Sequence, residues 1–256
     1  MTGVAPVAII TGASSPVGIG AAIARRLARA GWRLVLVAEG PADDLDQVAA
    51  ECRQLSSPGG DAVAHLADLG DPGAATALVD VAVAQFGRVD ALVNNAGLRI
   101  FKKFGDFTCA EFDASVAVNL RAPFLTSQAV LPVMRRQGGG RIVHVASQLG
   151  SVSFPTRGLY GLTKAALIHL TKTMALELAR ENIIVNAISP GPIRTAIAMD
   201  REIADPEAAQ ARLDHVPMGR MGRPEEVADI VFMLLTTSAT YLTGHDLIVD
   251  GGYTLH

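Results

Sequence analysis

The sequence predicts an α/β fold: a doubly wound, seven-stranded parallel sheet with helices on both faces. Short β-branched runs alternate along the chain with longer Ala- and Leu-rich amphipathic segments, which is typical of strand–helix–strand units. Half of the 256 residues are hydrophobic but only 5% are aromatic. We therefore expect a core of Ala, Val, Leu and Ile, as where helices pack on a sheet. The length suits a single domain over residues 1–256.

The alternation predicts each element in turn. Strands are expected near Val7–Ile10, Arg33–Ala38, Ala62–His65, Ala91–Asn94, Arg141–Ala146, Ile183–Ile188 and Asp246–Val249. Helices are expected over Gly18–Ala30, Asp43–Leu55, Pro72–Phe86, a long pair across Cys109–Arg136, Leu159–Ala179 and Pro224–Leu235. Residues 193–221 break the pattern. Long connections of this kind are commonly lids, so we expect a mobile flap there with one short helix.

Charge and cysteine content exclude several classes of protein. The net charge is −3 and no Lys/Arg run exceeds two residues, so a nucleic acid partner is not expected. The two cysteines, Cys52 and Cys109, form no CxxC pattern and fit a reducing compartment. The chain has no apolar segment near the roughly 18 residues of a membrane span and no leader-like N-terminus. We expect a cytoplasmic protein with no membrane partner. The six scattered histidines predict no metal site.

A glycine-rich segment, Thr11–Gly20, follows the first predicted strand and precedes the first helix. Glycines at this position let the backbone approach a pyrophosphate, whose charge then lies at the helix N-terminus. The alternative is a turn that only connects the two elements. The nucleotide contacts predicted here are Gly12, Ser14, Ser15, Gly18, Ile19 and Gly20.

An acidic residue ends the second predicted strand. Glu39 lies 19 residues after Gly20, close to the spacing of about 20 at which a carboxylate meets the adenosine ribose. It would repel a 2′-phosphate, and Thr11–Gly20 contains no Arg or Lys. NAD is therefore favoured over NADP. The alternative is a solvated loop acid. Asp68 and Leu69 follow the third strand and are expected near the adenine, although Asp68 could instead start the next helix.

Further motifs occur in a characteristic order. They are Thr11-Gly12 with Gly18 and Gly20, Asn94-Asn95-Ala96-Gly97, Asn119, Ser147, Tyr160-Gly-Leu-Thr-Lys164 and Pro190-Gly191. In order and spacing they resemble the short-chain dehydrogenase/reductase family, and the match spans Val4 to Gly252. The resemblance implies a Rossmann-type catalytic domain, NAD(P)-dependent interconversion of secondary alcohols and ketones, and usually a homotetramer.

The chemistry of alcohol oxidation explains why Tyr160 and Lys164 would both be needed. An alcohol that gives up hydride must also lose its proton, which requires a base that works near neutral pH. Tyrosine has an ordinary pKa of about 10. Lys164 lies four residues later, on the same helix face, and an ammonium about 4 Å away is strong enough to bring a tyrosine toward neutrality. By resemblance, Ser147 binds the substrate oxygen and Asn119 holds a water linking Lys164 to solvent. The alternatives are a loop serine and a turn asparagine.

The resemblance also implies further cofactor contacts. Lys164 and Tyr160 would lie at the nicotinamide ribose, and the segment after the sixth strand would meet the carboxamide; the remaining contacts are Asn95, Ala96, Gly97, Pro190, Gly191, Ile193 and Thr195. Pro-Gly-Pro also makes a rigid turn without any ligand. The family places three residues between Thr-Gly and Gly-x-Gly, whereas this chain has five, Ala13–Val17. Which of Ser14, Ser15 and Val17 faces the phosphates therefore stays open.

The sequence thus predicts an NAD-preferring oxidoreductase for a small or medium carbonyl or secondary alcohol. One alternative is an NADPH-dependent reductase of 3-oxoacyl thioesters, for which Glu39 is the discriminator. An alternative of another class is a nucleotide-sensing or scaffold protein without turnover. The basic residues Arg99, Lys102, Lys103 and Arg157 could attract an anionic substrate or a carrier's phosphate, or be ordinary solvated charges.

Overall fold

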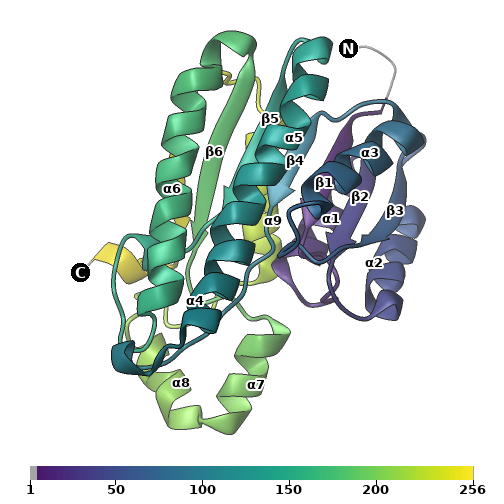
Figure 1. Ribbon diagram of the computed structural model, residues 1–256. Helices are drawn as coiled ribbons and strands as arrows, with labels where there is room; N and C mark the ends of the chain where they lie inside the picture. The colour runs from purple at the N-terminus through teal and green to yellow at the C-terminus, as the bar shows by residue number, and fades with distance from the viewer. Residues whose placement is uncertain (1–4, 256) are drawn as a thin grey trace.

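The computed structural model describes residues 5–255, apart from the side chains of residues 197, 201, 202, 206, 208 and 212. Residues 1–4, part of the N-terminus from which no leader was expected, lie outside this range. Seven parallel strands form one sheet in the order β3-β2-β1-β4-β5-β6-β7 (Figure 1). They are β1 (Val7–Thr11), β2 (Arg33–Ala38), β3 (Asp61–Leu66), β4 (Ala91–Asn94), β5 (Gly140–Val145), β6 (Ile183–Pro190) and β7 (Asp246–Val249). The predicted Rossmann-type fold class is confirmed.

The strand order reverses at β1. Ile9 of β1 pairs with Val35 of β2 on one side and with Leu92 of β4 on the other. From β1 the chain first moves outward to β3 and then returns to continue through β7. Ligands of open α/β sheets bind at the carboxyl ends of the strands beside such a switch point. The fold therefore places the predicted nucleotide site between β1 and β4.

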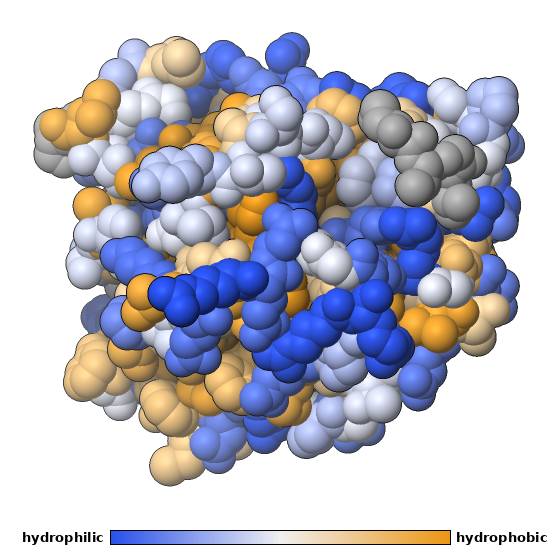
Figure 2. Space-filling view, turned by 90° about the horizontal axis from the view of Figure 1, so that it is seen from above, coloured by the Kyte–Doolittle hydropathy of each residue, from blue (hydrophilic) through white to orange (hydrophobic). Residues whose placement is uncertain are grey.

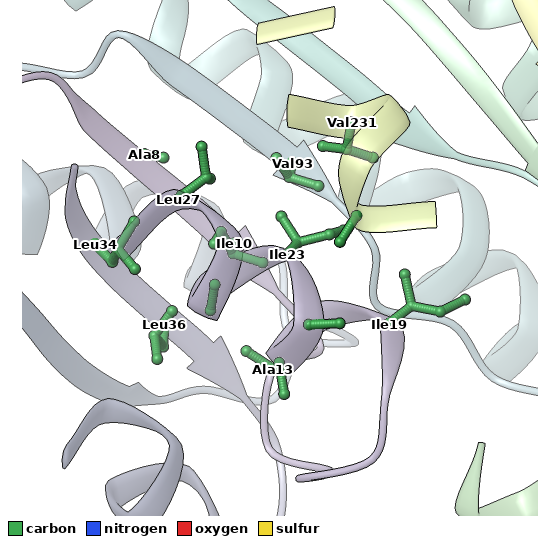
Figure 3. Close-up of a cluster of buried hydrophobic side chains, with 14 of the residues drawn as sticks. Ala8, Ile10, Ala13, Ile19, Ile23, Leu27, Leu34, Leu36, Val93 and Val231 are labelled. Carbon is green, nitrogen blue, oxygen red and sulfur yellow. The ribbon is translucent and has the colours of Figure 1, made fainter. Parts of the chain in front are cut away.

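Helices cover both faces of the sheet, and on each face an apolar core lies between the helices and the strands. One core holds α1 (Ile19–Ala28), α2 (Ala42–Leu55) and α9 (Pro224–Thr236); the other holds α3 (Ala74–Phe86), α5 (Ala122–Gln137) and α6 (Gly158–Leu178). In the first core, Ile10, Ile23 and Val231 bring β1, α1 and α9 together (Figure 3). Each is fully buried, so α1, which follows the glycine-rich segment, is fixed against the sheet.

The helix predictions over residues 72–86 and 109–136 differ from the structure. α3 begins at Ala74 and not at Pro72, because Asp71 Oδ1 accepts the Gly73 N–H at 3.0 Å and holds a separate turn. The expected pair across residues 109–136 is present as α4 (Cys109–Val116) and α5, but they are joined by a π-helical turn, Ala117–Arg121. Hydrophobic periodicity did not predict this turn.

The predicted flap contains two helices, α7 (Ala196–Ala204) and α8 (Pro206–Leu213), and not one. Its two ends lie side by side, because the Arg194 N–H donates to the Gly222 carbonyl and the Gly222 N–H to the Pro192 carbonyl, each at 2.9 Å. Figure 1 shows α7 and α8 below the carboxyl ends of the strands. The flap therefore begins and ends at the same edge of the sheet, where the site is expected. Its mobility stays a prediction.

Figure 2 shows the opposite end of the molecule, where a band of hydrophilic residues runs between hydrophobic patches. Arg88 and Asp90 form an ion pair at 2.6 Å just before β4. In the part of the chain that the structure describes, no helix has both the length and the apolar character to cross a membrane.

Candidate active site

A cleft opens at the carboxyl ends of β4, β5 and β6. Nine of the predicted site residues line it: Ile19, Asn95, Gly97, Ser147, Tyr160, Lys164, Pro190, Gly191 and Ile193. Other lining residues include Arg99, Phe101, Gln148, Leu149 and Arg157, and the flap contributes Ala198 and Met221. Residues from distant parts of the sequence therefore meet where the topology predicts a ligand site.

Tyr160 lies in the first turns of α6 and is buried. Its ring packs edge-on against Phe101, with ring centroids 5.7 Å apart. Burial by itself would raise the pKa of the Tyr160 hydroxyl, but the positive charges of Lys164 and Arg99 and hydrogen bonds with Ser147 and Arg99 bring it below its ordinary value. The phenol is therefore prepared to give up and recover a proton.

Lys164 lies one turn further along α6. Its Nζ donates a hydrogen bond to the Val145 carbonyl at 2.8 Å and lies 5.6 Å from the centre of the Tyr160 ring. Burial lowers the pKa of Lys164, and the neighbouring Arg99 lowers it further, while Tyr160 opposes this change. The carbonyl at the end of β5 thus holds the ammonium beside the phenol.

Ser147 reaches Tyr160 because the chain after β5 approaches α6 closely. A Cβ on Gly161, the residue after Tyr160, would lie 2.6 Å from the Leu149 carbonyl oxygen, so only glycine fits this position without displacement. The Ser147 hydroxyl accepts the Leu149 N–H at 3.2 Å and hydrogen-bonds to Tyr160. The two residues therefore line one cleft.

Asn119 is fully buried in the π-helical turn. Its Nδ2 donates to the Leu98 carbonyl at 2.9 Å and to Thr163 Oγ1 at 3.1 Å, and its Oδ1 accepts the Leu98 N–H at 2.7 Å. The amide thereby ties the loop after β4 to α6. Because the amide is engaged in this way, we assign its side chain a positioning role, and the water relay stays a prediction. π-helical turns are frequent at functional sites.

The glycine-rich segment is held between β1, β4 and α1. A Cβ on Gly20 would lie 2.3 Å from the Gly12 carbonyl oxygen, so α1 begins very close to the end of β1. Asn95 Nδ2 donates to the Thr11 and Gly12 carbonyls, each at 2.9 Å. No side chain caps the first turn of α1 among the described residues. The backbone N–H groups there suit a phosphate.

The longer glycine-rich segment has a partner that sequence inspection missed. Arg25 Nη1, from α1, donates to the Pro16 carbonyl at 2.7 Å. The same guanidinium forms an ion pair with Glu51 of α2 at 2.6 Å. Arg25 of α1 thus holds the longer loop in place. Arg25 lies 9 residues from Pro16 and 26 residues from Glu51 in the chain, so these contacts leave no local signal in the sequence.

The remaining predicted cofactor residues are not among those that line the cleft. Glu39 and Asp68 are exposed at the ends of β2 and β3, and Asp68 Oδ1 accepts the Gly70 N–H at 2.7 Å. Leu69 is buried in the core beneath α3, with Ala96 packed against that core. The side chains of Leu69 and Ala96 therefore support the sheet, and a nucleotide would meet their backbone. Ser14, Ser15 and Gly18 lie in the loop itself.

The segment predicted to meet the nicotinamide carboxamide can be tested for its fit to that group. Ile193 lines the cleft. Thr195 Oγ1 is buried and has no hydrogen-bond partner among the described residues. A buried hydroxyl without a partner is costly unless a ligand supplies one, and a carboxamide would do so. The residues present thus fit a dinucleotide that extends from the glycine-rich segment to Thr195.

Sequence inspection also missed two residues of the cleft, Arg99 and Gln148. Arg99 was singled out only as a possible attractor of anions, yet it lines the cleft with Tyr160 and its positive charge lowers the pKa of that phenol. Gln148 follows Ser147 and is buried, and its Oε1 has no partner among the described residues. The position of Gln148 directly after Ser147 was the signal in the sequence that it would line the cleft.

Comparisons with known proteins agree with this geometry. A family model described as "Enoyl-(Acyl carrier protein) reductase" matches residues 12–254. The D-beta-hydroxybutyrate dehydrogenase of Rhizobium meliloti is 35% identical over 96% of this chain and 98% of that protein. The 2-(R)-hydroxypropyl-CoM dehydrogenase of Xanthobacter autotrophicus is 39% identical over 97% and 98%. A solved short-chain dehydrogenase/reductase from Serratia marcescens superimposes with a TM-score of 0.90 at 36% identity, over 98% of each chain.

The chain belongs to the short-chain dehydrogenase/reductase family. It is an oxidoreductase that acts on CH–OH donors, and NAD(P) is the cofactor typical of its family. The prediction of an enzyme with a small-molecule alcohol or carbonyl substrate is confirmed at this level.

Proposed function

We propose that the protein interconverts a secondary alcohol and a ketone, with NAD as cofactor and Tyr160 as the general acid and base. The observation that carries the proposal is that Tyr160, Ser147, Lys164 and Arg99 line one cleft, with Lys164 Nζ 5.6 Å from the centre of the Tyr160 ring. Bound NAD would supply the hydride acceptor for alcohol oxidation. The chain's own residues then have to bind the alcohol, remove its proton and exclude water.

Each residue has a step in this proposal. The Ser147 hydroxyl holds the substrate oxygen beside the phenol. Tyr160, as phenolate, takes the hydroxyl proton during oxidation and returns it during ketone reduction. Lys164 keeps the phenolate accessible near neutral pH and would hold the nicotinamide ribose. Asn119 positions α6 through Thr163. Gly12, Ser14, Ser15, Gly18, Ile19 and Gly20 would hold the pyrophosphate, with Thr195 at the carboxamide.

NADH should be used in preference to NADPH, because the exposed Glu39 at the end of β2 would repel a 2′-phosphate. Glu39→Gln removes that charge and is expected to raise kcat/KM for NADPH by about 10-fold, the effect of losing one repulsive charge pair of about 1.4 kcal/mol. Initial rates with each cofactor at equal concentration check this. The matched control is Glu177→Gln, which removes an exposed carboxylate from α6.

Faster turnover of NADPH than NADH by the unaltered enzyme would contradict the Glu39 assignment. That result would favour the second candidate, an NADPH-dependent reductase of 3-oxoacyl thioesters. The description of the matching family model, which names an acyl carrier protein, supports this candidate. A protein that binds nucleotide without any turnover of alcohols, ketones or thioesters would instead be a sensor or scaffold.

A homotetramer in the cytoplasm is part of the proposal. Large apolar side chains are exposed on neighbouring helices: Phe124 of α5 is 44% exposed, and Leu162 and Leu176 of α6 are 57% and 85% exposed. Such a surface is typical of an interface between subunits. Light scattering should therefore give four times the mass of the chain, and Phe124→Lys should reduce it.

The control for the assembly is Ile203→Lys, which changes an exposed apolar residue of α7 outside this helical surface. A monomeric mass for the unaltered protein, or an equal effect of both variants, would contradict the assignment of the α5 and α6 surface.

A further inference from the structure

We propose that the substrate carries a second, uncharged hydroxyl group close to its reacting carbon, and that the side-chain amide of Gln148 binds this group. This substrate class rests on the proposed function and specifies it further: the alcohol is a diol and the ketone is a hydroxyketone. Gln148 lines the cleft together with Ser147 and Tyr160. It is thus the residue that would decide which alcohols the enzyme accepts.

The Gln148 side chain is buried and lacks a hydrogen bond. Only 5% of the residue is exposed, and its Oε1 has no hydrogen-bond partner among the described residues. A buried amide oxygen without a partner is costly, and folded proteins rarely leave one in this state unless water or a ligand supplies the donor. Because Gln148 lines the cleft, a molecule bound there can supply it.

The backbone that carries this amide is held in place. Gln148 begins a 3₁₀ turn that ends at Gly150, and the Gln148 carbonyl accepts the Ser151 N–H at 2.9 Å. A Cβ on Gly150 would lie 3.0 Å from the backbone nitrogen of Ala165, so the turn packs directly on α6, the helix of the reacting phenol. A residue that selects substrates needs a fixed backbone of this kind.

The neighbours of Gln148 favour the substrate over the cofactor as its partner. Gln148 directly follows Ser147, which holds the substrate oxygen in the proposed function. Consecutive Cα atoms lie about 3.8 Å apart, so the two side chains start close together. The proposed partner of the nicotinamide carboxamide is Thr195, whose buried Oγ1 also has no partner among the described residues. Cofactor and substrate would then each satisfy one of these two oxygens.

The charges of the cleft favour an uncharged donor. An amide oxygen only accepts hydrogen bonds, so its partner must carry an O–H or N–H group. The described residues that line the cleft include the cations Lys164 and Arg99 and no carboxylate. A substrate ammonium group would therefore be repelled, whereas a hydroxyl donates a hydrogen bond without bringing a charge. We accordingly assign a hydroxyl to Gln148 Oε1.

Matched ketones test this substrate class. We would measure kcat/KM with NADH for 1-hydroxybutan-2-one and 4-hydroxybutan-2-one, and for the methyl ether of each, which keeps the oxygen but cannot donate. One hydroxyketone is expected to exceed its ether by about 10-fold or more, because the ether leaves the buried oxygen unpaired. The preferred hydroxyketone shows whether the hydroxyl lies on the carbon next to the carbonyl or one carbon further away.

Three variants assign the preference to the amide. Gln148→Met removes the amide but keeps the length of the side chain, and should bring the ratio of hydroxyketone to ether close to about 1. Gln148→Glu keeps an acceptor oxygen and should retain part of the ratio. Gln85→Met makes the same change as the first variant at an exposed position of α3 and should leave the ratio unchanged.

The ratio also separates substrate binding from a structural role. Loss of packing around Gln148 would lower the rates with hydroxyketone and ether together and leave their ratio intact. Calorimetric titration of each variant with the hydroxyketones, in the presence of NAD, measures binding of the ketone without its reduction.

The outcomes distinguish the two proposals. Ethers reduced as well as hydroxyketones, or a ratio that Gln148→Met does not change, would overturn the role of Gln148 and leave the proposed function standing. Hydroxyketone binding that is lost in Gln148→Met, without turnover of any alcohol or ketone, would overturn the proposed function and keep the assignment of Gln148. Neither binding nor turnover of any hydroxyketone would overturn the hydroxyl-bearing substrate class outright.

Discussion

Tyr160→Phe is expected to reduce kcat/KM for alcohol oxidation and for ketone reduction by about 10³-fold or more, because the proton then has no acceptor or donor in the cleft. The ring of the variant keeps its edge-on packing against Phe101. NADH binding, followed by its fluorescence, should therefore change by less than about threefold. Steady-state rates at saturating cofactor provide the measurement.

Tyr241→Phe is the matched control for this variant, since Tyr241 is fully exposed and lies outside the cleft-lining residues. It should retain the rate of the unaltered enzyme. If Tyr160→Phe turned over substrate at a comparable rate, Tyr160 would not be the proton carrier.

Lys164→Met should lower the rate by about 10²-fold or more and move the pH profile of alcohol oxidation to higher pH. Oxidation needs the phenolate, so the rate rises with pH through the pKa of Tyr160. The charge of Lys164 helps to lower that pKa, and its removal must raise it. The rate of the variant should thus recover partly in alkaline solution, where more of Tyr160 is ionised.

Lys172→Met makes the same chemical change at an exposed position two turns further along α6. Its pH profile should match that of the unaltered enzyme. A Lys164→Met profile that fell uniformly, with no displacement along the pH axis, would restrict Lys164 to cofactor binding.

The sequence predicted the sheet well because parallel strands buried on both faces form short apolar runs between recognisable helices. All seven strands were placed to within two residues at each end. The flap was harder, since α7 and α8 are short and part of their faces stays exposed, as at Ile203. The π-helical turn at Ala117–Arg121 has no periodicity of its own within a continuous helical segment, so it was predicted only as helix.

The site was predicted where its residues follow a strand or share a helix. Tyr160 and Lys164 are four residues apart and Ser147 follows β5, and the order of these motifs carried the family resemblance that implied their roles. The role of Arg99 at the Tyr160 hydroxyl depends on a loop 61 residues away in the chain returning across the cleft. Likewise the contact of Arg25 with Pro16 depends on how α1 lies behind its own loop. Such contacts follow from packing and leave no periodic signal.

The most direct test of the central claim is the titration of Tyr160 itself. The chain has three tyrosines, so the ultraviolet absorbance of tyrosinate in the unaltered protein, minus that of Tyr160→Phe, isolates one phenol. We expect this phenol to ionise below the ordinary tyrosine pKa of about 10, and Lys164→Met to move its ionisation to higher pH. A difference titration at or above the ordinary value, unaffected by Lys164→Met, would contradict the account.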